Sequence, residues 1–228
     1  MPNDRTPLIT NRSEIDAFFE RGRALAKATS ASNGCGRMIF AIDATGSRER
    51  SWDLACQVQG EMFEEAARTG ALSIQLVYYR GTRECQASRW VADGRTLASL
   101  MEKIDCRTGL TQIGRVLDHV RKENALQRVQ AVVFVGDAAE ERPCDLFAAA
   151  SGLRVPLFLF QENDDLAATR VFTEIARLTK GAHCRFTPGA ARELAELLRA
   201  VATYATGGLQ ALSASPNAGA VKLLQQLK

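Results

Sequence analysis

Met38-Ile39-Phe40-Ala41-Ile42-Asp43-Ala44-Thr45-Gly46-Ser47 is an apolar run that ends in an aspartate and two spaced hydroxyl residues. The apolar part predicts a strand that is buried on both faces, as in a parallel sheet. Ligands of open α/β sheets bind where such strands end. A carboxylate and two neutral oxygens are hard ligands for a hard divalent cation. The stretch therefore predicts a central strand followed by a candidate metal loop.

Strand-like and helix-like patterns alternate along the chain as β-α-β-β-α-α-β-α-β-α-β-α. The six predicted strands cover residues 37–42, 72–79, 84–91, 129–135, 155–160 and 182–186. The short link Arg80-Gly81-Thr82 makes the second and third strands an antiparallel hairpin. Right-handed crossovers then favour the order 3-2-1-4-5-6. We expect an α/β fold: a Rossmann-like doubly wound sheet with one antiparallel edge strand and helices on both faces.

Three regions are expected around this fold. Residues 1–35 form an N-terminal helix, at about Ser13 to Ala28, and a loop. Residues 36–205 form the α/β domain, in which one helix is expected over residues 51–68. Residues 206–228 form a Gly- and Ser-containing linker and a short amphipathic tail, which is too short to be stable as an isolated helix.

Composition excludes several classes of function. A net charge of +3 on 228 residues and an aromatic content of 7% do not favour nucleic-acid binding. No apolar run approaches the ~20 residues that cross a bilayer, and no signal peptide is visible, so no membrane contact is expected. The six cysteines form no C-x-x-C pair and are expected to be reduced, which fits the cytoplasm. The oligomeric state stays open.

Two further segments complete the pattern around Asp43. Thr111 lies in Gly109-Leu110-Thr111-Gln112-Ile113-Gly114, before a predicted helix, and Asp137 follows the fourth predicted strand. This ordered trio resembles a von Willebrand factor A (VWA) domain with a metal-ion-dependent adhesion site, over about residues 37–204. Thr45 stands where a serine is more frequent in the family pattern, but the hydroxyl is kept.

The resemblance implies a non-enzymatic protein-interaction module. Asp43, Thr45, Ser47, Thr111 and Asp137 would hold Mg²⁺, with Mn²⁺ or Ca²⁺ as alternatives. Mg²⁺ prefers six oxygens and keeps waters, so a carboxylate from an Asp or Glu of a protein partner can complete its shell.

Charged residues near these segments have two interpretations. Arg48, Arg50 and Arg107 are assigned to a rim that attracts an acidic partner; alternatively, Arg48 and Arg50 only solvate the start of a helix. Glu140, Glu141 and Arg142 are expected to form a solvated rim.

Two alternatives to the metal site stay open. Asp43, Thr45 and Asp137 are residue types that also cap helices. The first motif also resembles that of haloacid-dehalogenase-like, Mg²⁺-dependent phosphatases, in which Asp43 would be the nucleophile and Gly136-Asp137 with Glu141 the late acidic motif. However, a second aspartate is expected two residues after the nucleophile, and Thr45 stands there.

Overall fold

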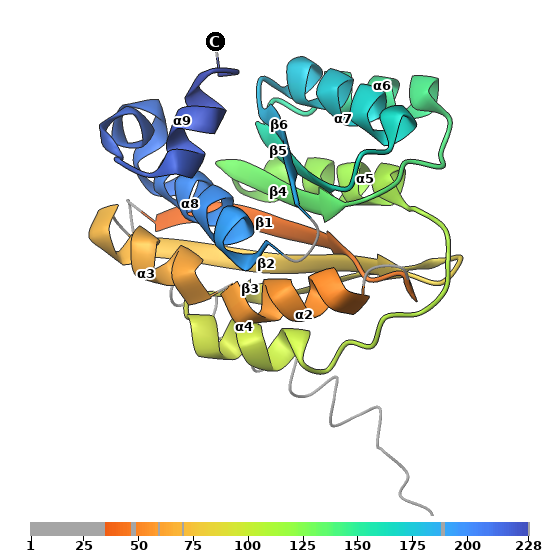
Figure 1. The fold of residues 1–228 in the computed structure, drawn as a ribbon, viewed down its shortest axis with the longest axis horizontal. Helices are drawn as coiled ribbons and strands as arrows, with labels where there is room; N and C mark the ends of the chain where they lie inside the picture. Colours follow the sequence, from red (N-terminus) through yellow and green to blue (C-terminus); the bar gives the residue numbers. More distant parts are fainter. Residues whose placement is uncertain (1–34, 47–48, 59, 70, 188–189, 228) are drawn as a thin grey trace, which may run out of the picture. The chain divides into compact units, whose positions relative to one another are not determined.

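The apolar run before Asp43 forms the central strand β1 of a six-stranded sheet (Figure 1). The computed structural model describes residues 35–46, 49–58, 60–69, 71–187 and 190–227. Residues 34–228 form one compact unit, separate from residues 1–33. The predicted helix at Ser13 to Ala28 lies outside the described residues.

The sheet confirms the predicted strand order, 3-2-1-4-5-6. Only β2 and β3 pair in antiparallel fashion, and the other neighbours are parallel. The described strands are β1 Cys35–Asp43, β2 Ala71–Arg80, β3 Glu84–Val91, β4 Ala131–Gly136, β5 Leu157–Glu162 and β6 Ala182–Phe186.

Helices cover both faces of the sheet (Figure 1). Met38, Phe40 and Ile42 of β1 contact the layer of α2, α3, α4, α8 and α9, whereas Ile39 and Ala41 contact α5, α6 and α7. This alternation explains why the run is apolar at every position. The described helices are α2 Glu49–Val58, α3 Gly60–Thr69, α4 Gly94–Met101, α5 Ile113–Leu126, α6 Pro143–Ser151, α7 Leu166–Thr179, α8 Ala191–Ala214 and α9 Ala218–Leu224.

Two predicted segments differ from the structure. The single helix expected over residues 51–68 is two helices, α2 and α3, and α3 starts at Gly60, a residue of low helix propensity. The linker expected over residues 206–215 is helical up to Ala214. Gly208 has a positive φ of 67° and kinks α8, but Leu212 beyond it is fully buried in the core. Packing of that leucine therefore keeps the segment helical despite its glycines.

The end of the chain covers an edge of the sheet. Within α9, Ala220 and Leu223 are fully buried against the core. Beyond it, the Gln226 side chain binds the backbone of His183 in the edge strand β6 twice. Its Nε2 donates to the His183 carbonyl at 2.8 Å, and its Oε1 accepts from the His183 N–H at 2.9 Å. The amide of Gln226 thus takes the place of a neighbouring strand at this residue.

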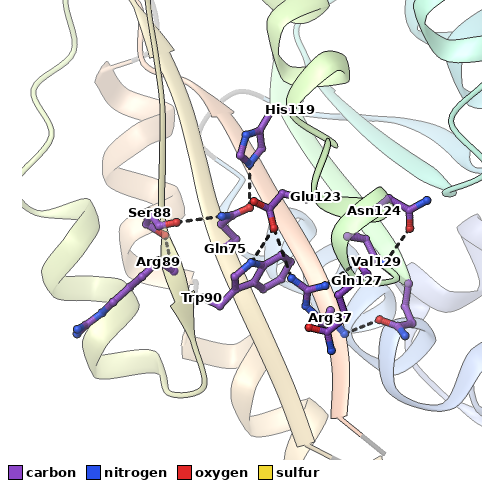
Figure 2. A network of polar contacts seen from close by, with 11 residues as sticks. Arg37, Gln75, Ser88, Arg89, Trp90, His119, Glu123, Asn124, Gln127 and Val129 are labelled. Carbon is purple, nitrogen blue, oxygen red and sulfur yellow. Dashed lines mark hydrogen bonds and ion pairs between the residues drawn. The ribbon is translucent and has the colours of Figure 1, made fainter. Parts of the chain in front are cut away.

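A partly buried polar network holds α5 on the sheet (Figure 2). Arg37 of β1 lies over the Trp90 ring of β3, with its Cζ 3.8 Å from the ring centroid. The Glu123 carboxylate of α5 accepts from Trp90 Nε1 at 3.0 Å and lies 3.4 Å from Arg37 Nη2. Arg37 Nη1 also donates to the Gln127 carbonyl at 2.6 Å. Burial lowers the pKa of Arg37, and the Glu123 carboxylate opposes that shift.

A second contact fixes the same helix. His119 Nε2 of α5 lies 2.9 Å from Gln75 Oε1, and Gln75 Nε2 donates to the Ser88 carbonyl at 3.0 Å (Figure 2). The pairing of β2 with β3 changes register between Gln75 and Val77, and Ser88 lies in this irregular stretch. Because α5 follows directly after Thr111 and Gln112, both contacts help to fix the position of the loop that carries Thr111.

Candidate functional site

Asp43 and Asp137 leave neighbouring strands at the same edge of the sheet. Ile42 of β1 pairs with Val135 of β4, and the next residues are Asp43 on one strand and Gly136-Asp137 on the other. Asp43 is only 1% exposed, and Asp137 is half-buried. The sheet therefore brings these two carboxylate-bearing segments to one edge, where the parallel strands end.

The loop after β1 is shaped by its own aspartate. Asp43 Oδ1 accepts a hydrogen bond from the Thr45 backbone N–H at 2.7 Å. This is the local turn that aspartate side chains favour. Thr45 is 6% exposed, so both residues are buried at the base of the loop. Ser47, the third residue of the motif, lies outside the described residues.

The loop that carries Thr111 lies against the loop after β1. The Arg107 N–H donates to the Ala44 carbonyl at 3.0 Å. Gly109 packs so closely on Gly81 that a Cβ at Gly109 would lie 2.1 Å from the Gly81 carbonyl oxygen. The Leu110 N–H donates to the same oxygen at 3.1 Å. Only glycine fits at position 109, and this fixes how the loop approaches the hairpin.

Two polar side chains join this loop to the β2–β3 hairpin: Gln112 from the loop and Arg80 from the hairpin. Gln112 Nε2 lies within hydrogen-bond distance of the carbonyls of Arg80 (3.2 Å), Gly81 (3.3 Å) and Glu84 (3.3 Å). Arg80 Nη1 donates to the Asp105 carbonyl at 2.8 Å, and Arg80 Nε pairs with the Glu84 carboxylate at 2.9 Å. The antiparallel hairpin thus acts as a support for residues 105–112.

Thr111 is bound by two glutamates, which sequence analysis missed. Its N–H donates to Glu140 Oε2 at 2.8 Å, and its Oγ1 accepts from the Glu140 N–H at 2.9 Å. The Thr111 hydroxyl donates to Glu141 Oε2, and Glu141 Oε1 accepts from the Gly114 N–H at 3.1 Å at the start of α5. Glu140 and Arg142 are exposed, as expected for a solvated rim, but the contacts of Glu140 and Glu141 with Thr111 were not expected. Their carboxylates satisfy N–H groups that would otherwise lack partners near the helix start.

The oxygen atoms that these loops offer are of the kinds that a hard divalent cation binds. Asp43 and Asp137 offer carboxylate oxygens, and Thr45 and Thr111 offer hydroxyl oxygens. A hydroxyl has one donor and two acceptor positions. Thr111 Oγ1 uses its proton for Glu141 and one lone pair for the Glu140 N–H, which leaves one lone pair for a ligand. Within the described residues, no group of three or more His, Cys, Asp or Glu side chains gathers to hold a metal, so a site here would mix carboxylates with hydroxyls.

Of the three arginines predicted to form a rim, only Arg107 has a side chain that the structure describes. Arg107 is exposed, and its guanidinium lies 3.3 Å from the Asp105 carboxylate. Arg48 lies outside the described residues, as does the side chain of Arg50. Next to Thr111, Leu110 is 54% exposed, which adds an apolar surface to this edge.

The phosphatase pattern gains no support from the position of Glu141. That carboxylate binds Thr111 and Gly114 instead of standing free beside Asp137 as part of a late acidic motif. Thr45 occupies the position where the phosphatase pattern has its second aspartate, and its N–H is bound to Asp43.

No protein-family model matches the chain, and no curated protein matches it in sequence. Solved structures share its fold at low identity. The VWA domain of SpRpn10 has a TM-score of 0.54 and 13% identity, with 70% of this chain and 94% of that domain covered. An aerotolerance-related membrane protein from Bacteroides fragilis NCTC 9343 has a TM-score of 0.53 and 13% identity, with 72% and 98% covered. The vWF domain of the type V pili tip protein Mfa5 from Porphyromonas gingivalis has a TM-score of 0.55 and 11% identity, with 75% and 95% covered.

The first and the third of these structures are named as VWA or vWF domains, and both share the fold of this chain over more than two thirds of its length. The chain described in residues 35–227 therefore has the fold of a von Willebrand factor A domain.

Proposed function

We propose that this domain binds a protein partner through a divalent cation. Mg²⁺ is the first choice, with Mn²⁺ and Ca²⁺ as alternatives, and the ligands are Asp43, Thr45, Ser47, Thr111 and Asp137. The observation that carries the proposal is the junction of the three loops: β1 and β4 end side by side, and the Arg107 N–H binds the Ala44 carbonyl. Ser47 enters the set from the resemblance alone.

The partner is a protein that presents an aspartate or glutamate. When bound, the cation would supply a positive centre that a partner carboxylate can approach. The chain's own residues prepare this edge. Asp43 fixes the turn at Thr45. Glu141 accepts the hydrogen bond that the Thr111 hydroxyl donates, so that a lone pair of this hydroxyl is available. The exposed Arg107, which is paired with Asp105, is the described member of the proposed rim that attracts an acidic partner.

The proposed compartment is the cytoplasm. All six cysteines are free thiols in the structure, which is the state that a reducing compartment maintains. None of the helices in the described part of the chain has both the length and the hydrophobicity that crossing a lipid bilayer requires.

Calorimetric titration of the full chain with Mg²⁺ and Mn²⁺ tests the metal site. Asp43→Ala, Asp137→Ala and Thr111→Ala are each expected to abolish binding, and Thr111→Ser is expected to retain it because the hydroxyl remains. Thr108 is the competing hydroxyl of the same loop, and Thr108→Ala is expected to retain binding. Loss of binding with Thr108→Ala but not with Thr111→Ala would assign the ligand to Thr108 instead. Undiminished binding by all three alanine variants would overturn the assignment.

Affinity purification with and without EDTA tests the partner. Proteins that are lost on chelation from the wild type, and are absent with Asp43→Ala, are the expected metal-bridged partners.

The phosphatase alternative is tested by incubating the full chain with a generic aryl phosphate and Mg²⁺. No turnover is expected, and turnover that Asp43→Asn abolishes would establish the phosphatase alternative instead.

A further inference from the structure

A cavity of about 530 Å³ lies at the opposite edge of the sheet, where the parallel strands begin. It is bounded by Pro156, just before β5, by Lys180 at the end of α7, and by Tyr204 and Leu209 of α8. This volume falls within the range of small-molecule sites. None of the residues around the candidate metal loops lines it.

Apolar side chains form one part of the cavity walls, and Ser151 and Thr179 add hydroxyl groups to the lining. Pro156, Leu178, Leu209 and Leu227 line it together with the ring of Tyr204. Leu209 is 49% exposed, which is high for a leucine whose neighbour Leu212 is fully buried. The kink at Gly208 separates Leu209 from the preceding part of α8. An aliphatic ligand would cover this leucine and remove its apolar surface from water.

Cations surround these apolar walls. Arg154 and Lys180 line the cavity, and no acidic side chain does so. Arg128 lies near enough to Tyr204 to oppose the rise in the pKa of that phenol caused by burial. Within the described residues, no ion pair engages the side chains of these three cations. An anion at this edge would therefore meet positive charge that no described carboxylate neutralises.

The backbone at the two lining cations is unusual. Arg154 has a φ of 49° and Lys180 a φ of 56°, which is the left-handed region that glycine adopts most readily. Asn163 is the other described non-glycine residue with a positive φ, and it does not line the cavity. Two cationic residues therefore stand at positions where a glycine would meet less steric hindrance, and both line the same cavity.

We propose that this cavity binds an amphipathic carboxylic acid of medium chain length, with its aliphatic body against the leucines and its carboxylate between Arg154 and Lys180. The leucines that line the cavity match the aliphatic chain of such a ligand, and the two cationic residues match its carboxylate. The proposal is independent of the metal site, because the two sites lie at opposite edges of the sheet.

Titration of the full chain with decanoate, below its micelle concentration, tests the proposal. Decanoate is expected to bind. The neutral decanol and the cationic decyltrimethylammonium are expected to bind at least tenfold more weakly, because neither offers a carboxylate for charge-assisted hydrogen bonds. Equal affinity for decanol would overturn the role of the cations, and absence of decanoate binding would overturn the site.

Glycine variants of the residues with positive φ separate an effect on decanoate binding from an effect on folding. Arg154→Gly and Lys180→Gly are each expected to weaken decanoate binding roughly tenfold or more without lowering the melting temperature, because glycine accepts the same backbone conformation. Asn163→Gly is the matched control and is expected to leave decanoate binding unchanged. Unchanged decanoate binding by both cation variants, or an equal loss with Asn163→Gly, would refute the proposal.

Discussion

Replacing Glu123 by alanine removes the acceptor that joins Arg37 and Trp90 beneath α5. The change leaves the Arg37 guanidinium, in a residue only 8% exposed, without its carboxylate, and it leaves Trp90 Nε1 without its acceptor at 3.0 Å. Breaking a fully buried pair costs about 3–5 kcal/mol, and this pair is only partly buried. We expect the lower end, about 3 kcal/mol, because Arg37 keeps the Gln127 carbonyl and the Trp90 ring.

Chemical and thermal denaturation of the full chain measure this loss. For a domain of this size, about 3 kcal/mol corresponds to a fall in melting temperature of roughly 6–12 °C. Asp118→Ala is the matched control on the same helix, because its pair with Arg121 is exposed and is worth less than about 1 kcal/mol. Arg37→Met, made alone and combined with Glu123→Ala, completes a double-mutant cycle, for which we expect a coupling of at least about 1 kcal/mol.

Two results would refute this reasoning. A loss below about 1 kcal/mol for Glu123→Ala would mean that the network contributes no more than a surface pair. Additive effects of the Arg37 and Glu123 substitutions, within about 0.5 kcal/mol, would mean that the two side chains do not depend on one another.

Three other predictions follow from the described contacts. Glu141→Ala is expected to destabilise the fold by about 1–2 kcal/mol, because α5 loses a carboxylate near its start; a denaturation midpoint equal to that of the wild type would contradict this. Asp137→Ala is expected to maintain or raise the melting temperature in EDTA, because one of two neighbouring carboxylates is removed and Asp43 is relieved of repulsion; a clear fall would contradict it. Burial, assisted by Arg185, lowers the pKa of His183 to about 4, below the value of about 6.5 in an unfolded chain. The unfolded chain therefore binds more protons between these values, so the free energy of unfolding should decrease as the pH falls from about 6.5 to about 4. His183→Gln should flatten this dependence, and an unchanged pH profile would argue against it.

The strand order was predictable because it depends on local patterns and general rules. The apolar runs at residues 38–42 and 129–135 identify strands buried on both faces, and the short link at Gly81 requires a hairpin. The handedness of crossovers then leaves few arrangements of the sheet. The position of Asp43 beside the Gly136-Asp137 segment follows from that order alone.

The contacts of Glu141 and Arg37 were not predictable in this way. Glu141 binds a hydroxyl 30 residues earlier in the chain, yet it lies in a charged segment with the composition of an ordinary surface loop. Arg37 pairs with a glutamate 86 residues away, and nothing in a strand sequence marks a buried cation. Likewise, the glycines before Leu212 suggest a linker, because helix propensity is local whereas the burial of that leucine is decided by the rest of the fold.

The bond pattern between Gln226 and His183 has a consequence for how the protein behaves in solution. Gln226, 43 positions further along the chain, binds both the N–H and the carbonyl of His183. These groups lie in β6, the edge strand of the described sheet, on the side where no further strand pairs with it. Loss of this amide would leave the groups open to a strand from another molecule. Damage at Gln226 would then become visible as turbidity and self-assembly at high concentration, while the interior of each molecule stays intact.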